Sequence, residues 1–188
     1  MTWEERSRFV RQTGFTLLEL LTVIAIIGIL AGIVIGVGRR ATESGKGSRA
    51  RAELAVIGTA LESYKRICGD YPQTDDEARL LQSLIGKAAP KGEPMTGRVL
   101  LEMAKFAEAA PMAPTVPVDP FVNPGAVLLD PWGQPYVYVY KVPATGWANS
   151  SYVLYSIGPD GRDVPALLPG GLPDATPADN TDNLHANR

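Results

Sequence analysis

A long apolar run near the amino terminus constrains this chain more than any other feature. Between Phe15 and Gly38 the residues are apolar except for two threonines and Glu19, and no charged residue follows Glu19 within the run. As a helix that rises about 1.5 Å per residue, residues 20–38 would extend roughly 28 Å. The hydrocarbon core of a bilayer is about 30 Å thick. We therefore predict a transmembrane helix over residues 15–38.

Other interpretations compete for this run. Gly36-Val37-Gly38 is a small-x-small site of the kind that ends a secretory signal peptide, but the apolar region of such a peptide is usually about 7–15 residues long. The same glycines could belong to a dinucleotide-binding fingerprint, which needs a short strand before it. The run is too long for one strand. An uncleaved membrane anchor fits the length, but it does not explain the residues at the start of the run.

Those starting residues combine a polar leader, a glycine and a carboxylate. The leader, residues 1–14, carries Arg6, Arg8 and Arg11 and ends at Gly14. Glu19 then lies inside the apolar run, where a carboxylate costs about 2.5–3.5 kcal/mol on insertion scales. A charge placed there calls for a cationic partner.

The stretch Gly14-Phe15-Thr16-Leu17-Leu18-Glu19-Leu20-Leu21 resembles the class III signal of type IV pilins and of the pseudopilins of type II secretion. The resemblance implies that a prepilin peptidase cleaves the bond between Gly14 and Phe15 and methylates the new amino terminus. It also implies that Glu19 pairs with the terminal amine of a neighbouring subunit. Residues 39–188 are then expected to form a periplasmic domain, held by a single pass through the bacterial inner membrane.

Glycines inside the run recur every four residues, at Gly28, Gly32 and Gly36, and so share one helical face. Small residues at this spacing let membrane helices approach closely, which predicts subunit packing. The other interpretation is that membrane helices simply tolerate glycine. Many members of the family that the signal resembles carry proline where this chain has Gly36. Basic residues beyond the run outnumber those of the leader, so the orientation is implied by the resemblance alone.

Beyond the run, apolar spacing predicts a second stretch of helix. Residues 54–68 place apolar side chains three and four positions apart, on one stripe of an amphipathic helix. Gly69 is expected to cap this helix, and Pro72 prevents its continuation. Residues 44–48 are small and polar, and they favour either a flexible joint or a weak helix.

Two shorter helices and a loop are expected next. Residues 74–77 match a capping box, which would open a helix that ends at Leu84 or Ile85. Residues 97–110 are interpreted as a third helix. Prolines recur over residues 110–125, which predicts an extended loop.

The second half of the chain has the pattern of a small sheet. Strands are predicted at residues 127–129, 136–140 and 152–157, with turn chemistry at 130–135. Alternation places the tyrosines of the middle strand on one sheet face, where we expect packing rather than ligand binding. The predicted fold class is α+β: a long amino-terminal helix packed on a small antiparallel sheet of three or four strands, as in pilin-like proteins.

The last thirty or so residues are irregular and acidic, which by itself is typical of a solvated tail. Carboxylates and carbonyls in a glycine-rich loop are also the hard oxygen ligands that calcium prefers. Residues 130–136, 155–161 and 179–184 resemble the end of a major pseudopilin of type II secretion, and this resemblance implies a calcium-binding loop in place of a disulfide. The ligands expected are Asp160, Asp179 and Asp182, with the carbonyls of Leu154 and Ser156, and Asp163 as a substitute.

Composition excludes several other functions. The net charge of -2 gives no basic surface for nucleic acid. Cys68 is the single cysteine, so no disulfide can form within the chain. His185 is the single histidine, and no catalytic set of serine or cysteine with histidine can be assembled around it. We therefore do not expect an enzyme.

The resemblance implies a structural subunit of a periplasmic pseudopilus that helps to export folded proteins. Its expected partners are other copies of itself, prepilin peptidase, an inner-membrane assembly platform, minor pseudopilins and membrane lipid. A type IV pilus subunit or a minor pilin is the nearest alternative. A membrane-anchored binding or enzymatic domain is a more distant one, since it would need neither Glu19 nor a free amine at Phe15.

Overall fold

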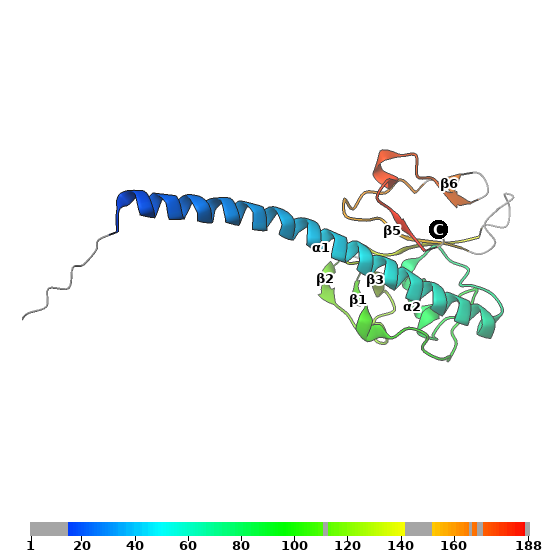
Figure 1. Ribbon diagram of the computed structural model, residues 1–188. Coiled ribbons are helices and arrows are strands. Elements are labelled where there is room, and N and C mark those ends of the chain that lie inside the picture. The colour runs from blue at the N-terminus through cyan, green and yellow to red at the C-terminus, as the bar shows by residue number, and fades with distance from the viewer. Residues whose placement is uncertain (1–14, 111–112, 142–151, 166, 169–170, 187–188) are drawn as a thin grey trace, which may run out of the picture. The chain divides into compact units, whose positions relative to one another are not determined.

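The structure is a computed structural model that describes residues 15–110, 113–141, 152–165, 167–168 and 171–186 (Figure 1). The chain divides into two compact units, Met1–Thr42 and Glu43–Arg188. The predicted α+β fold class is confirmed: a long amino-terminal helix is followed by small antiparallel sheets.

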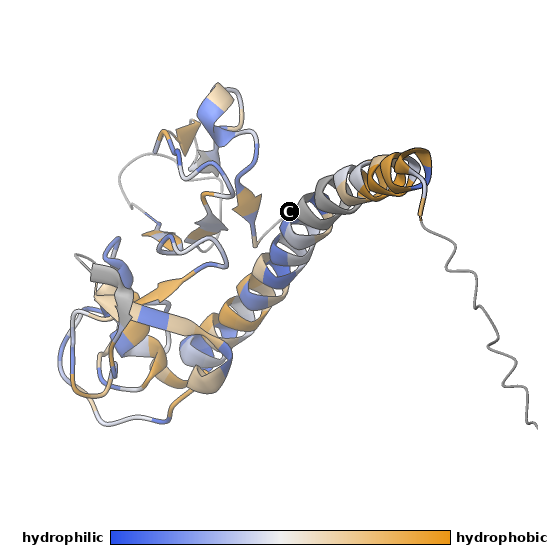
Figure 2. Ribbon diagram, turned by 90° about the vertical axis from the view of Figure 1, so that its left-hand side faces the viewer, coloured by the Kyte–Doolittle hydropathy of each residue, from blue (hydrophilic) through white to orange (hydrophobic). Residues whose placement is uncertain are grey.

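Helix α1 runs from Leu17 to Cys68 without a break. From Leu20 to Ile33 its side chains are apolar except for Thr22, as the predominantly orange end of the helix in Figure 2 shows. In the second unit one stripe of α1 is buried, which confirms the predicted amphipathic pattern; the stripe includes Leu54, Ile57, Leu61 and Tyr64. Gly69 follows with a φ of 87°, a left-handed conformation that ends the helix at the expected residue.

Helix α2 (Glu77–Leu84) forms as predicted, but the expected capping box does not close it. Its N-cap is Asp76, whose carboxylate accepts hydrogen bonds from the backbone N–H groups of Ala78 and Arg79. Thr74 instead accepts from the N–H of Asp76. The Asp76 carboxylate caps the helix because it lies two positions closer than Thr74 to the two free N–H groups at the helix start.

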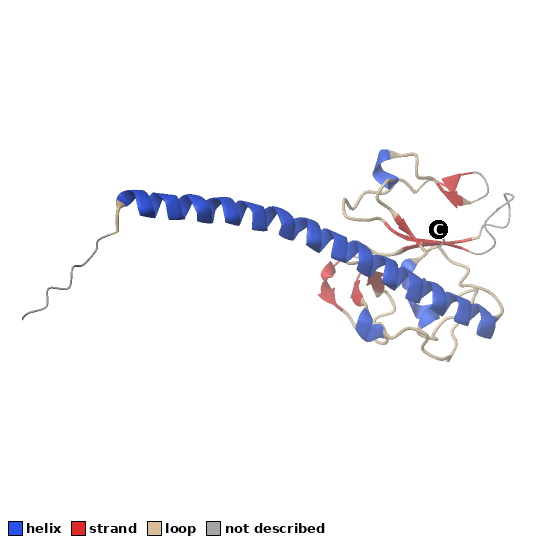
Figure 3. Cartoon of the chain, in the orientation of Figure 1, coloured by secondary structure: helices blue, strands red, loops and turns tan. Residues whose placement is uncertain are grey.

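Among the described residues, eight short strands form three antiparallel sheets (Figure 3). The first sheet has the order β2 (Ala113–Pro117), β1 (Ala107–Ala110), β3 (Val127–Leu129). The second has the order β4 (Val137–Tyr140), β5 (Tyr152–Ser156), β8 (Leu184–His185). The third pairs β6 (Leu167–Leu168) with β7 (Leu172–Pro173). The described sheets are thus smaller and more numerous than the single sheet expected.

The helix predicted over residues 97–110 is wrong. A single 3₁₀ turn, η1 (Met103–Lys105), occupies its centre, and β1 occupies its end. Ala107 and Ala109 pair with Leu129 and Val127 of β3, so tertiary pairing overrides the helix propensity of alanine. The extended loop expected over residues 110–125 contains β2, which pairs with β1.

The main core lies between the second part of α1, helix α2 and strands β3 to β5. Tyr136 and Tyr138 are buried and Tyr140 is half-buried, which confirms that this tyrosine face serves packing. Their hydroxyl groups donate to Glu53, to the Pro72 carbonyl and to Asp70, respectively. The face of the sheet is therefore tied to α1 and to the loop that follows it.

The carboxyl-terminal segment is more ordered than a solvated tail. It forms β6, β7, the 3₁₀ turn η2 (Ala178–Asn180) and β8. Within it Asn180 is 4% exposed and hydrogen-bonds with both backbone groups of Val164 and with the Asp174 carbonyl. The buried side-chain amide of Asn180 thus bridges Val164 and Asp174, the two ends of the segment between them.

Candidate functional site

The start of α1 forms a capping box of its own. Thr16 donates to Oε2 of Glu19 from both its backbone N–H and its hydroxyl, each at 2.9 Å. The N–H of Glu19 donates back to the Thr16 hydroxyl at 3.2 Å. Oε1 of Glu19 accepts no hydrogen bond from the described residues. The predicted assembly carboxylate therefore has one oxygen occupied within its own chain and one that is not.

Apolar side chains cover the first part of α1 and remain uncovered in the single chain. Phe15 is 84% exposed, and the leucines, isoleucines and valines that follow, as far as Ile33, are at least 46% exposed. A Cβ added at Gly28 or Gly32 would meet nothing within 4 Å, so the isolated chain gives no packing reason for either glycine. Within the part of the chain that the structure describes, no helix meets the combined requirements of length and apolar character for crossing a membrane.

Some predicted residues cannot be placed. The leader, residues 1–14, and with it the cleavage residue Gly14, lie outside the described residues. Gly36 lies in a stretch of α1, residues 34–39, whose side chains are also outside the description. The cleavage at Gly14 and the third glycine of the packing face therefore stay predictions.

The structure brings two of the predicted calcium ligands together. The backbone N–H of Asp160 lies 3.3 Å from Oδ2 of Asp182, although 22 positions separate them. Gly158 has a φ of 78°, and a Cβ there would lie 2.6 Å from the Asp182 carbonyl oxygen. Only glycine lets the loop after β5 approach the carboxyl-terminal segment so closely.

Two buried oxygens in this region are unsatisfied. Oδ1 of Asp182 and Oδ1 of Asn183 are buried and accept no hydrogen bond from the described part of the chain. A buried oxygen without a donor is costly, and an unseen cation is one common explanation. Asn183 was not among the residues predicted from the sequence, because an asparagine in an irregular segment is an ordinary turn residue.

The other predicted ligands have partners elsewhere. Asp179 lies 4.0 Å from Arg162, and the Leu154 carbonyl accepts from the N–H of Ala186. Asp163, the expected substitute, accepts from Tyr155 and Asn183 at 2.7 and 3.0 Å. Among the described residues no three His, Cys, Asp or Glu side chains lie close enough together to hold a metal ion.

A buried aspartate in the turn before β4 was also missed by the sequence analysis. Asp130 is 3% exposed, and its Oδ1 accepts from the N–H groups of Trp132 and Gln134, each at 2.9 Å. Its Oδ2 accepts from the Ser156 hydroxyl at 2.5 Å, and that hydroxyl also accepts from the N–H of Gly158. Asp130 thus joins the turn to the loop that holds Asp160. The turn was predicted, but a local pattern cannot show a partner 26 positions away.

Two family models match consecutive parts of the chain. Residues 10–35 match the family model for the prokaryotic N-terminal methylation motif, and residues 39–165 match the model for type II secretion system (T2SS) protein G. No solved structure matches the chain.

Curated relatives carry the same description. The chain is 30% identical to the type II secretion system core protein G of Pseudomonas aeruginosa over 153 residues, which cover 81% of this chain and 87% of the relative. It is 30% identical to the protein of the same name from Escherichia coli over 152 residues, 81% and 85% of the two chains. A shorter match, 36% identical over 73 residues, covers 39% of this chain and 33% of the toxin coregulated pilin of Vibrio cholerae. The chain therefore belongs to the protein G family of the type II secretion system, a family of pseudopilus subunits.

Proposed function

We propose that this chain is cleaved after Gly14, anchored in the inner membrane and polymerised through α1 into a homopolymeric periplasmic filament that helps to export folded proteins. The observation that carries the proposal is the start of α1, where a methylation motif, a self-capped Glu19 and an uncovered apolar helix coincide. Prepilin peptidase would process the chain. An inner-membrane platform, minor pseudopilins and lipid would be its other partners.

Glu19 supplies the proposed specificity of assembly. Its Oε2 is held by Thr16, so the carboxylate has a fixed direction, and Oε1 accepts no hydrogen bond from the described residues. A carboxylate in lipid is stabilised when a cation meets it. After cleavage the amine of Phe15 in a neighbouring subunit provides that cation. Gly28 and Gly32 would let the two helices approach.

The test compares two substitutions at the same helix start. Glu19→Ala removes the charge but leaves the Thr16 hydroxyl to accept from the N–H of residue 19, whereas Thr16→Val removes that hydroxyl and keeps both the charge and the backbone N–H bond to Oε2. We expect Glu19→Ala to insert in the membrane but to reduce filament yield by at least about tenfold, because its loss removes a charge-assisted contact. Thr16→Val should assemble to a much greater extent.

Mass spectrometry of the mature chains completes this test. Wild type and both variants should begin at an N-methylated Phe15, which separates an assembly defect from a processing defect. An intact Met1, cleavage near Gly38, or wild-type filament yield for Glu19→Ala would each contradict the proposal. The match to a pilin keeps a type IV pilus subunit as the second candidate, which electron microscopy of surface filaments would reveal.

A mechanical rather than catalytic role is part of the proposal. The lone histidine, His185, packs its ring against Tyr155 at a centroid distance of 5.1 Å. Three open hollows in the described part of the second unit, beside Trp132, along residues 55–63 of α1 and beside α2, hold no nucleophile and base in hydrogen-bond reach of one another. A fourth, much smaller hollow is lined by His185, Tyr155 and Asp163, whose carboxylate accepts from the Tyr155 hydroxyl.

We also propose that the carboxyl-terminal loop binds calcium. The unsatisfied oxygens of Asp182 and Asn183 and the nearby Asp160 are oxygen donors of the type that calcium takes. Asp179 and the carbonyls of Leu154 and Ser156 are the remaining predicted ligands. When bound, the metal would neutralise the carboxylates and hold the loop to β5. The chain supplies the geometry by the close approach of Gly158 to Asp182.

Thermal unfolding of the full-length chain in detergent tests this site. Saturating calcium should raise the Tm by about 5–10 °C, because it binds the folded loop alone. Asp182→Ala should abolish this shift and Asp160→Ala should reduce it. Asp174→Ala is the matched control, since Asp174 lies in the same segment and caps the exposed Thr176. An equal Tm shift in Asp182→Ala and wild type would mean that calcium binds elsewhere. If calcium shifts the Tm of neither protein, the carboxyl-terminal segment binds no calcium and is held by its hydrogen bonds alone.

A further inference from the structure

The helical state of α1 at residues 43–48 needs an explanation. This stretch contains Ser44, Gly45, Gly47 and Ser48, all poor helix formers, yet α1 passes through it unbroken. The Ser48 hydroxyl donates to the Ser44 carbonyl, a bond that does not favour a straight helix. Among the described residues, the first fully buried one of α1 is Ala50, and α1 joins the main core only at Leu54. Neither composition nor the core therefore accounts for the helix here.

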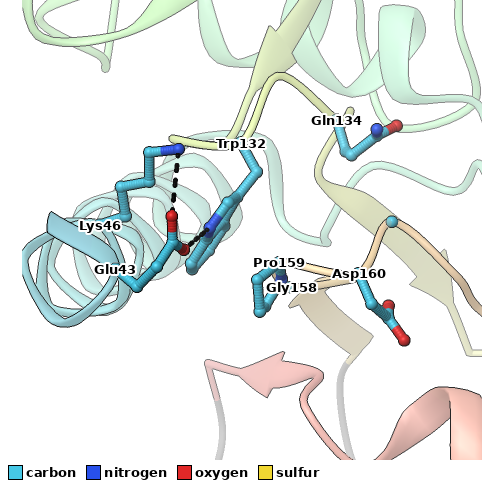
Figure 4. Close-up of a pocket in the computed structure, with 8 residues that line it drawn as sticks. Glu43, Lys46, Trp132, Gln134, Gly158, Pro159 and Asp160 are labelled. Carbon is cyan, nitrogen blue, oxygen red and sulfur yellow. Dashed lines mark hydrogen bonds and ion pairs between the residues drawn. The ribbon is translucent and has the colours of Figure 1, made fainter. Parts of the chain in front are cut away.

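A contact from a distant turn reaches this stretch at its first residue. The indole Nε1 of Trp132 donates to Oε2 of Glu43 at 2.7 Å, across 89 positions of sequence (Figure 4). Oε1 of Glu43 lies 3.7 Å from the Lys46 ammonium. Glu43 is the first residue of the second compact unit. The contact thus holds α1 at the point where the helix enters this unit.

Trp132 is itself presented from a rigid turn. Asp130, which is buried, accepts from the Trp132 N–H, from the Gln134 N–H and from the Ser156 hydroxyl. The N–H of Gly133 also donates to the Asp130 carbonyl. The turn therefore fixes the backbone of Trp132, with or without the hydrogen bond from its indole N–H to Glu43.

The tip of the indole, in contrast, has room to move. Glu43, Lys46 and Trp132 line one side of a hollow of about 470 Å³, and the loop from Gly158 to Gly161 lines another side. Figure 4 shows Pro159 beside the indole, with the Asp160 carboxylate directed away from Glu43 and Trp132. Trp132 and its partner are partly exposed, unlike the tyrosines of the main core. The contact can therefore break without opening the core.

We propose that Trp132 and Glu43 form a latch that keeps residues 43–48 of α1 helical and that opens independently of the core. With the latch closed, these residues continue the helix. With it open, their composition makes them a flexible joint. The two interpretations that the sequence left open for this stretch are thus two states of one segment. The latch goes beyond the filament and calcium proposals, and it requires neither.

Hydrogen exchange measured by mass spectrometry on the full-length chain in detergent tests the latch. Trp132→Phe keeps an aromatic ring but lacks the N–H donor, and Glu43→Ala lacks the acceptor. Each should speed amide exchange over residues 44–49 by about tenfold, because a hydrogen bond to a charged group is lost. Amides of β4 and β5 should exchange at the wild-type rate.

Three further variants make the result specific. Lys46→Ala removes the ion pair but keeps the latch, so it should exchange like wild type. Glu43→Gln keeps a carbonyl acceptor and should lie between wild type and Glu43→Ala. The double variant Glu43→Ala/Trp132→Phe should be no faster than either single variant, since both remove one contact.

Two outcomes would overturn the latch. One is wild-type exchange over residues 44–49 in both Trp132→Phe and Glu43→Ala. The other is an equal acceleration over β4 and β5, which would make Trp132 a general stabiliser of the unit. Because this measurement uses unassembled chains without added metal, it can fail while filament assembly and calcium binding hold, and the reverse is also true.

Discussion

One helix, α1, meets two different requirements along its length. In the first unit its large apolar side chains are exposed in the single chain, and Thr16 satisfies one of the two carboxylate oxygens of Glu19 at its start. In the second unit its apolar stripe is buried against α2 and the sheets, and its buried Glu53, 6% exposed, pairs with Arg49 and Tyr136. The first part has an apolar surface that the described chain leaves uncovered, while the second part is buried within the chain.

The largest expected effect comes from substituting two leucines of α1, one in each unit. Leu54 is 1% exposed and Leu30 is 57% exposed. Leu54→Ala should lower the free energy of unfolding by about 2–5 kcal/mol, because it leaves a cavity in the core. Leu30→Ala should leave the unfolding of the second unit unchanged and lower filament yield instead. Urea denaturation in detergent, followed by tyrosine fluorescence, measures the first quantity; equal losses at both sites would contradict the division.

The second prediction sharpens the comparison through a buried acid. Asp130 is satisfied by three donors from its own unit. Asp130→Ala should lower the free energy of unfolding by about 2–3 kcal/mol, because the donors lose a charged partner in a buried place. Ser156→Ala, which removes one donor, is the matched control and should cost about 1 kcal/mol. A loss no greater than that of the control would show that the turn does not depend on the carboxylate.

Glycines provide the third contrast. At Gly158 the φ of 78° and the approach of Asp182 exclude a side chain, whereas Gly28 faces open space. Gly158→Ala should cost about 1–2 kcal/mol from the left-handed backbone alone, and it should weaken calcium binding by the adjacent loop. Gly28→Ala should not reduce stability, and any defect should appear in filament yield. Calorimetry of both variants, with and without calcium, separates the two roles.

The smallest effect concerns Asp70. Partial burial raises its pKa, but hydrogen bonds from Tyr140, the Tyr71 N–H and Gln73, with Lys65 nearby, outweigh burial and hold the pKa below its ordinary value. A depressed pKa contributes stability above the unfolded value, near 3.9, and this contribution is lost as the pH falls through the folded pKa.

Tyr140→Phe tests this contribution. At pH 7 it should cost less than about 1 kcal/mol, because the pair is largely solvated. The difference from wild type should shrink below about pH 4 as Asp70 is protonated. A difference that persists unchanged at pH 2 would mean that the hydroxyl matters for packing and not for the charge of Asp70.

Features with local causes could be predicted from the sequence. The stripe from Leu54 to Tyr64, the end of α1 at Gly69 and strands β3 to β5 depend on periodicity and turn residues, and they form as expected. Strand β1 was missed because its alanines favour a helix until β3 offers backbone partners. Local pattern decides elements where it is strong, and distant pairing decides them where it is weak.

The candidate site divides in the same way. Phe15 and Glu19 are recognisable because their motif is contiguous in sequence. The neighbourhood of Asp160 and Asp182, in contrast, depends on a backbone approach across 22 positions, and the unsatisfied oxygen of Asn183 becomes visible only in three dimensions. The spacing of residues along a single sequence does not reveal such a contact.

Asn180 has a consequence for how this family member could be altered. Its side chain joins Val164 to Asp174, so the chain between them leaves and returns at a single bridged point. The length of the segment between Val164 and Asp174 can therefore change without moving the sheet that carries Tyr155 and His185. Doubling it would add only about 0.6 kcal/mol of loop-closure entropy. The segment between Val164 and Asp174 is thus a suitable place to insert a label or a grafted peptide, far in sequence from the amino-terminal methylation motif.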